Sequence, residues 1–252
     1  MEDFLKNRIT NYWNNRAVNF QNQSYVEMKN DKLEKWRHEI VKVIGKRKNL
    51  RALDIGTGSG YMAMILASLG HETTGIDLCP QMIDAAQELN KRLLLNCNFF
   101  VSDAEQIDFP DNTFDIIIAR NLTWTLPNVQ KAYVEWYRLL KENGILLNFD
   151  ADYGENRFSE RKKSEEENYK IDNNVKAEKL HGNLDYTQLL ECDEIKDSLE
   201  ISKHRRPAWD VAAIEKCGFK ELTIDFILGN KIGNPKLSGK VSKVMFGLYA
   251  RK

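Results

Sequence analysis

Short apolar runs alternate with segments of helical periodicity through the middle of the chain. The runs that we expect to form strands lie at residues 51–55, 72–78, 98–104, 114–120 and 145–151. Between them, residues 61–70, 80–94 and 128–144 have helical patterns, and Gly70 and Gly144 mark two helix ends. This alternation predicts a mostly parallel sheet with helices on both faces.

Regular patterns return near the end of the chain. Residues 207–219 predict a helix with a glycine stop, and residues 220–228 and 243–251 are β-rich runs joined by a turn that contains glycine and proline. With the five earlier runs they predict a seven-stranded, doubly wound α/β sheet.

Two segments interrupt this pattern. Residues 1–45 are expected to form an N-terminal helical lid, and the polar residues 151–205 a cap insertion or, alternatively, a solvated excursion. The cofactor-binding core would then span residues 46–150, and residues 206–252 would complete it. Tyr12 and Trp13 lie in an aromatic, Asn-rich stretch that we expect to close over a ligand.

A glycine-rich loop follows the first predicted strand. The sequence Asp54-Ile-Gly56-Thr-Gly58-Ser-Gly60 leads directly from strand to helix, where glycines let a ligand approach the main chain closely. Asp54 would repel the diphosphate of a dinucleotide at this place, but it suits the cationic amino group and sulfonium of S-adenosylmethionine. The alternative is a surface aspartate that caps the following helix.

The next two predicted strands also end in acidic residues. Asp77 follows the loop by about 20 residues, the spacing at which a carboxylate accepts from ribose hydroxyls. Asp103 ends the third strand, where it can accept from an adenine amino group, and Leu78 and Met82 are expected to pack on the adenine. Because parallel strands share one ligand-binding edge, these residues predict a nucleotide site.

The motifs LDIGTGSG, GIDL, SDAEQIDFPDNTFDIIIARNLTWTL and RLLKENGILLNFD resemble those of class I S-adenosylmethionine-dependent methyltransferases. The branch most similar acts on small molecules and is related to the ubiquinone-biosynthesis enzymes; the resemblance covers roughly residues 36–150. It implies a Rossmann-like fold, S-adenosylmethionine as cofactor and S-adenosylhomocysteine as product. The positions that it implies for the cofactor are Asp54 and Gly56 at the methionine, Asp77 at the ribose, Asp103 and Ala104 at the adenine, and Arg120 through its backbone.

The resemblance also has gaps. Relatives often carry a histidine after the fourth strand, where this chain reads NLTWTL, and the Asn/Asp-Pro-Pro-aromatic motif of amino-directed DNA methyltransferases is absent. Methyl transfer is an in-line displacement that needs a base only when the acceptor must lose a proton. The catalytic residue therefore stays unknown; the candidates are Asp152, Tyr153, His181 and His204. Arg205 and Arg206 are candidates for binding a substrate anion, or else solvated charges.

The composition of the chain limits the kinds of binding partner and the cellular location that we expect. Lys plus Arg and Asp plus Glu number 37 each among 252 residues, which argues against a nucleic-acid or anionic-membrane partner. Four cysteines are spaced without a CxxC pair and suggest neither disulfides nor a metal site, the N-terminus lacks the apolar run of a signal peptide, and no segment approaches the length of a membrane helix. We therefore expect a cytoplasmic monomer or homodimer that methylates a small molecule.

Alternatives remain open at this stage. They are an RNA or protein methyltransferase, supported by the basic clusters 46–48 and 203–206, a non-catalytic S-adenosylmethionine-binding module, and a nicotinamide dehydrogenase, which the glycine spacing and Asp54 disfavour. The identity of the acceptor and its methylated atom do not follow from the sequence.

Overall fold

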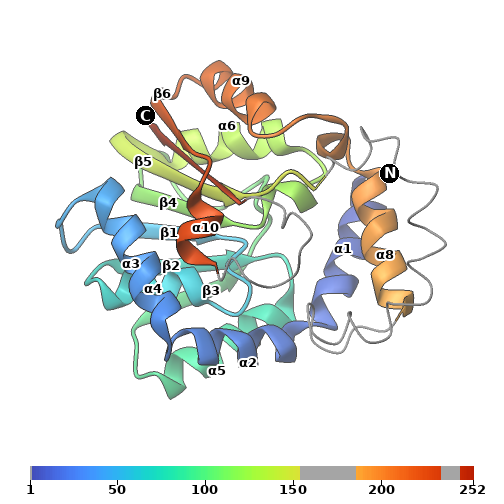
Figure 1. Cartoon of the computed structure of the whole chain (residues 1–252), viewed down its shortest axis with the longest axis horizontal. Coiled ribbons are helices and arrows are strands. Elements are labelled where there is room, and N and C mark those ends of the chain that lie inside the picture. The colour runs from blue at the N-terminus through green and yellow to red at the C-terminus, as the bar shows by residue number, and fades with distance from the viewer. Residues whose placement is uncertain (1, 154–185, 234–244) are drawn as a thin grey trace.

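The computed structural model describes residues 2–153, 186–233 and 245–252. They form one layered α/β unit (Figure 1). Its strands are β1 (Arg51–Ile55), β2 (Glu72–Asp77), β3 (Cys97–Val101), β4 (Phe114–Arg120), β5 (Leu140–Asp150), β6 (Lys220–Asp225) and β7 (Phe246–Arg251). Its longer helices are α1 (Glu2–Asn14), α2 (Ala17–Glu27), α3 (Asp31–Ile44), α4 (Tyr61–Ser68), α5 (Pro80–Arg92), α6 (Val129–Leu139), α8 (Tyr186–Ser198) and α9 (Ala208–Lys216). Shorter ones are α10 (Leu228–Ile232) and the 3₁₀ turns η1 (Thr123–Thr125) and η3 (Glu200–Lys203).

The seven strands form one sheet in the order β3-β2-β1-β4-β5-β7-β6. The first five are parallel, and β7 pairs antiparallel with both β5 and β6. The order reverses at β1, so the carboxyl ends of β1 and β4 flank the crevice where open α/β sheets bind ligands. The predicted seven-stranded, doubly wound sheet is confirmed.

Helices cover both faces of the sheet because its central strands are apolar on both. In β1, Ala52 belongs to a core cluster that includes residues of α3, α4 and α10, whereas the adjacent Leu53 belongs to a second cluster that includes residues of α6 and α9. Ile116 and Ile117 of β4 alternate in the same way, and all four side chains are fully buried. The α3 helix, inside the segment expected to form the N-terminal lid, thus packs on the sheet through Trp36 and Ile40.

The start of β5 differs from the prediction. The helix expected to run to Gly144 ends at Leu139, and Leu140 already pairs with Phe114 of β4. The register then shifts before Ile116 pairs with Ile145, and Asn143 has a φ of 62°. The Asn-Gly pair therefore forms an irregularity within the strand rather than the stop of the helix.

The C-terminal runs are shorter than predicted. β6 ends at Asp225, and the chain turns into α10 where a strand was expected to continue to residue 228. β7 begins at Phe246; residues 243 and 244 of the predicted run lie outside the described residues. The cause at β6 is burial: Leu228 is fully buried among α3, α4 and the sheet, whereas Phe226 and Ile227 are exposed.

The lid and cap segments lie together at one side of the sheet. α1 and α8 are far apart in sequence but run side by side at the right of Figure 1. Arg8 of α1 donates two hydrogen bonds to Glu191 of α8, the shorter of them 2.5 Å long, and also contacts Glu194. Residues 186–198 of the predicted cap insertion are therefore helical, while residues 154–185 lie outside the described chain. None of the described helices has the length and apolar character that crossing a bilayer requires.

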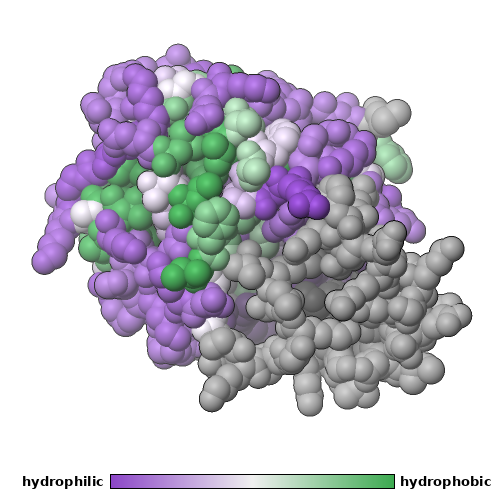
Figure 2. Space-filling view, turned by 45° about the horizontal axis from the view of Figure 1, so that its top comes forward, coloured by the Kyte–Doolittle hydropathy of each residue, from purple (hydrophilic) through white to green (hydrophobic). Residues whose placement is uncertain are grey.

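The surface around this fold is mostly hydrophilic. On the face shown in Figure 2, polar residues dominate, and apolar ones gather mainly in one area near the middle of the view.

Candidate functional site

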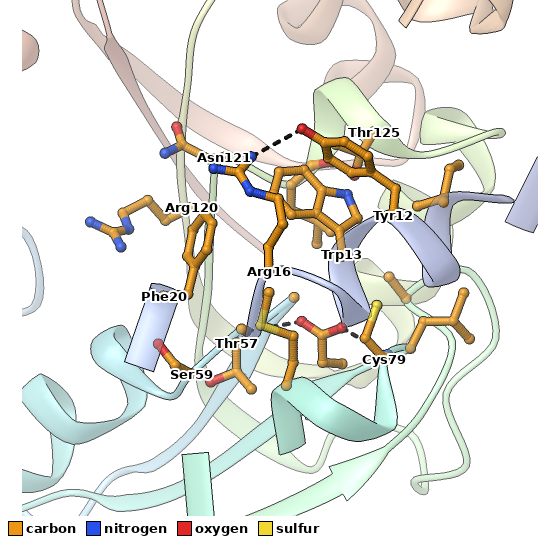
Figure 3. Close-up of a pocket in the computed structure, with 18 of the residues that line it drawn as sticks. Tyr12, Trp13, Arg16, Phe20, Thr57, Ser59, Cys79, Arg120, Asn121 and Thr125 are labelled. Atoms are coloured by element: carbon orange, nitrogen blue, oxygen red, sulfur yellow. Dashed lines mark hydrogen bonds between the residues drawn. The ribbon is translucent and has the colours of Figure 1, made fainter. Parts of the chain in front are cut away.

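A cavity of about 790 Å³ opens at the carboxyl ends of β1–β4, beneath α1 and α2. This volume falls within the usual range for small-molecule sites. Figure 3 shows Tyr12, Trp13 and Arg16 on one side of it and Thr57, Ser59 and Cys79 on the other. Every predicted cofactor-binding residue lines it: Tyr12, Trp13, Asp54, Gly56, Gly58, Asp77, Leu78, Met82, Asp103, Ala104 and Arg120.

The glycine loop has a left-handed backbone at three glycines, Gly56, Gly58 and Gly60, and the first two face the cavity. Gly56 has a φ of 65°, and a Cβ there would lie 2.6 Å from the side chain of Leu122. Gly58 has a φ of 53° and open space where its Cβ would stand. A side chain would be strained at both positions, and at Gly58 it would also fill the place where a ligand can approach the backbone.

Asp77 holds this loop in place. Its Oδ2 accepts a hydrogen bond from Gly58 N, and its Oδ1 accepts one from Cys79 N, both at 2.9 Å. Burial raises the pKa of Asp77, and these backbone bonds counter the rise. Each carboxylate oxygen has a second acceptor site. Asp77 can therefore accept hydrogen bonds from ligand hydroxyls while it keeps its bonds to the backbone of the loop.

Asp54 lies at the floor of the cavity. It is 1% exposed, and its Oδ2 accepts from Thr57 Oγ1 at 2.6 Å and Ala63 N at 2.9 Å. Burial raises its pKa to about 7, against the lowering effect of these two bonds. A carboxyl that ionises so reluctantly gains most from a cation placed beside it. The alternative considered for Asp54 was a surface residue that caps the next helix. Asp54 is buried, but its bond from Ala63 N does cap the first turn of α4, although Gly60 holds the N-cap position.

The β3 end carries a charge cluster that the sequence analysis did not anticipate. Asp103 accepts a hydrogen bond from Lys6 of α1 at 2.7 Å. The same ammonium lies 2.8 Å from Glu105 Oε2. The other carboxylate oxygen of Glu105, Oε1, accepts a hydrogen bond from Asn128 N at 2.6 Å. Lys6 and Glu105 both line the cavity. Only the fold shows that a lysine nearly a hundred residues away reaches Asp103.

An arginine stands among aromatic rings at the lid side. The Arg16 guanidinium lies 5.6, 5.3 and 5.1 Å from the ring centres of Tyr12, Trp13 and Phe20, and donates to Tyr12 Oη at 3.1 Å. Arg16 is only 7% exposed, yet it lines the cavity (Figure 3). Its position makes it a cation that a ligand carboxylate can reach.

A second aromatic group forms the wall next to the cap. Trp124 and Tyr153 pack as a tilted pair with ring centres 4.5 Å apart, and Trp13 meets Trp124 edge-on at 6.1 Å. All three line the cavity. Burial raises the pKa of Tyr153 above its ordinary value, so its hydroxyl stays protonated.

The other candidates for a catalytic role do not line the described cavity. Asp152 accepts from the backbone N of Arg206 at 3.1 Å. His204 stacks on Trp209 outside the cavity, with ring centres 5.2 Å apart. His181 lies outside the described residues.

Arg206 is not available to a substrate anion, contrary to that expectation. Its guanidinium donates to both oxygens of Asp210 and to Thr123 Oγ1, and lies 3.2 Å from Asp150. Its side chain is 2% exposed, because two buried carboxylates require a cation between them. Arg205 does not line the described cavity either.

The side chain of Arg120 turns away from the cavity centre. It lies 4.8 Å over the Tyr61 ring and 4.0 Å from Glu27 of α2. Arg120 still lines the cavity. Within the part of the chain that the structure describes, no group of three His, Cys, Asp or Glu side chains could hold a metal ion, and the four cysteines are free.

The sheet order, the glycine loop and the acidic strand ends define a class I methyltransferase fold. Residues 53–148 match the family model described as a methyltransferase domain.

Known methyltransferases are similar to this chain in sequence and in fold. A methyltransferase of Bacillus subtilis named YcgJ is 33% identical over 112 residues, 44% of each chain. A demethylmenaquinone methyltransferase of Tropheryma whipplei is 30% identical over 112 residues, 44% of this chain and 46% of its own. The chain thus spans less than half the length of these relatives. The crystal structure of an S-adenosylmethionine-dependent methyltransferase from Aquifex aeolicus has a TM-score of 0.54 at 19% identity, over 91% of this chain and 97% of its own, and so shares the fold.

Proposed function

We propose that this protein transfers the methyl group of S-adenosylmethionine to a small-molecule acceptor. One observation carries the proposal: Asp54, Asp77 and Asp103, at the carboxyl ends of three neighbouring strands, line a single cavity beside the glycine loop. A nicotinamide dinucleotide would bring a diphosphate to the same loop, where Asp54 disfavours it.

The residues present fit each part of this cofactor. Asp54 would stabilise the amino group, Asp77 would accept from the ribose hydroxyls, and Asp103 with Ala104 N would bind the adenine edge. Arg16 would bind the carboxylate, an assignment that its burial and charge at the cavity support. The backbone at Gly58 leaves room for close approach.

Bound S-adenosylmethionine supplies an already activated methyl group. The protein must therefore position the acceptor and exclude water. The Trp124–Tyr153 pair and Trp13 form a wall suited to both tasks. Tyr153, a catalytic candidate from the sequence, lines this wall, and we assign it to orienting the acceptor through its protonated hydroxyl.

A small acceptor fits better than a nucleic acid or protein. The basic residues 46–48 precede β1, so they lie at the edge of the parallel sheet opposite the cavity. In the other basic cluster, Arg206 is buried in ion pairs and cannot meet a phosphate backbone. The Tropheryma relative is named for a small-molecule substrate, which supports the same choice.

The test is calorimetry with S-adenosylmethionine, S-adenosylhomocysteine and NAD, followed by a metabolite screen with methyl-labelled cofactor. We expect both sulfur ligands to bind, NAD not to bind, and label to reach a small molecule. Tight NAD binding without binding of either sulfur ligand would overturn the proposal. Ligand binding without transfer to any acceptor class, macromolecules included, would favour a binding module.

A further inference from the structure

The ammonium group of Lys6 lies among three carboxylates at the β3 end of the cavity. Its Nζ is 2.7 Å from Asp103 Oδ2, 2.8 Å from Glu105 Oε2 and 3.2 Å from Glu2 Oε1. An ammonium has three hydrogens to donate. Lys6 donates one to Asp103, and its contacts to Glu105 and Glu2 are ion pairs. The bonds to Asp103 and Glu105 raise the pKa of Lys6 against the opposing effect of burial.

The three contacts are unequal. The Glu105 side chain is fully buried and fixed by Asn128 N, and Asp103 Oδ1 accepts from Glu105 N at 2.9 Å. Glu2 makes the longest contact and its side chain is 51% exposed. Exposed ion pairs contribute little to stability. The Glu2 contact is therefore the one that a ligand atom can replace at small cost.

Adenine offers a matching pair of groups. Along one edge its 6-amino group donates and its N7 accepts. Asp103 can only accept, and Lys6 beside it can only donate. If the adenine amino group binds Asp103, as the proposed function holds, the neighbouring N7 faces the ammonium of Lys6.

We propose that Lys6 is a cofactor-recognition residue that donates to adenine N7 while Asp103 accepts from the 6-amino group. The inference rests on the proposed function and extends it, because α1 then completes the adenine site that β3 begins. A guanine edge, which presents acceptors at both O6 and N7, would place an oxygen against the Asp103 carboxylate and be rejected.

The inference also couples the lid to the cofactor. Lys6 belongs to α1, and α1 packs beside α8 through Arg8 and Glu191 (Figure 1). A ligand that holds Lys6 holds α1 at the cavity.

The experiment measures binding of S-adenosylhomocysteine and of its 7-deaza analogue, in which a C–H replaces N7. Three full-length proteins are compared by calorimetry: wild type, Lys6→Met and Arg8→Met. Arg8→Met is the matched control, because it removes an ion pair of the same helix at a residue that does not line the described cavity.

We expect the wild type to prefer S-adenosylhomocysteine over the 7-deaza analogue by about tenfold, the effect of one hydrogen bond from a charged donor. Lys6→Met should weaken binding of the natural ligand about as much and bind both ligands equally. Arg8→Met should keep the preference, even if lid docking weakens both affinities.

Equal binding of the two ligands by the wild type would overturn the inference, and this measurement does not depend on any variant folding. A preference that persists in folded Lys6→Met would overturn it as well. If the wild type binds neither ligand, the proposed function itself fails; if it binds both alike, only the role of Lys6 fails.

Discussion

Arg206 donates hydrogen bonds to both carboxylate oxygens of Asp210, at 2.8 and 2.6 Å, one helical turn apart at the start of α9. Asp150, at the end of β5, lies 3.2 Å from the same guanidinium and accepts from Trp124 N. The two carboxylates and the arginine are buried, and burial raises the pKa of Asp150 against the effect of Arg206. This network joins α9, β5 and the η1 turn behind the Trp124–Tyr153 wall.

Removing the cation from this network should be costly. Arg206→Met leaves Asp150 and Asp210 buried without their partner, and we expect a loss of about 3–5 kcal/mol in the free energy of unfolding. Arg205→Met, at the exposed neighbour, should change it by less than about 1 kcal/mol. Urea unfolding of both variants decides; similar losses would show that the network does not stabilise the fold.

Asp77 should determine cofactor affinity more than stability. Asp77→Asn keeps one oxygen to accept from the glycine loop but removes the charge that strengthens bonds from ribose hydroxyls. We expect S-adenosylhomocysteine to bind about 1.5–3 kcal/mol more weakly. Calorimetry measures this, with Asp84→Asn on the exposed side of α5 as the control. Unchanged affinity in folded Asp77→Asn would contradict the ribose role.

The raised pKa of Asp54 predicts a pH dependence of binding. With a pKa of about 7, most of the carboxyl is protonated at pH 6 and most is ionised at pH 8. A cationic ligand favours the ionised form, so affinity should rise about tenfold across this interval. Titrations of S-adenosylmethionine at several pH values check this, and Asp54→Asn should bind weakly with a flatter profile.

The same pKa shift predicts a stability effect of opposite sign. The folded protein holds a proton on Asp54 that the unfolded chain releases near its ordinary pKa of 3.8. Stability without ligand should therefore fall as pH rises from about 4 to 7, by this group's contribution. Asp54→Asn should melt higher than the wild type at pH 8, with the difference shrinking at pH 4. A lower melting temperature at pH 8 would show that the carboxylate's hydrogen bonds outweigh its burial.

The sheet and the acidic strand ends could be predicted because both depend on local pattern. Asp54, Asp77 and Asp103 each follow an apolar run, and parallel strands bring such ends together whatever the loops do. Lys6 could not be placed, since its contact with Asp103 depends on how α1 docks. Arg206 was expected either to bind a substrate anion or to be a solvated charge, and it does neither, because its sequence does not show that Asp150 lies beside it. The pair Asn143-Gly144 is equally compatible with the end of a helix and with an irregularity within a strand, so the sequence does not distinguish the two.

We predict that α1, α2 and α8 form a lid that opens and closes over the cavity, and a measurement of their mobility tests this. α1 and α2 cover the cavity, and α8 meets α1 through the Arg8 ion pairs. Charged surface contacts of this kind are weak, so without ligand these helices should open more readily than the central strands. The methyl group must be shielded from water while an acceptor enters, which an opening lid allows.

Hydrogen exchange with and without S-adenosylhomocysteine should therefore show protection gained in α1 and α8, beyond the glycine loop. Arg8→Met should exchange faster in both helices without ligand and recover most of the protection with it, because Lys6 and Arg16 still reach the cavity. The strands β4 and β5, whose central residues are fully buried, should change little and serve as the internal reference. If α1 and α8 exchange identically with and without bound ligand, they form a fixed wall, and the acceptor must enter by another route.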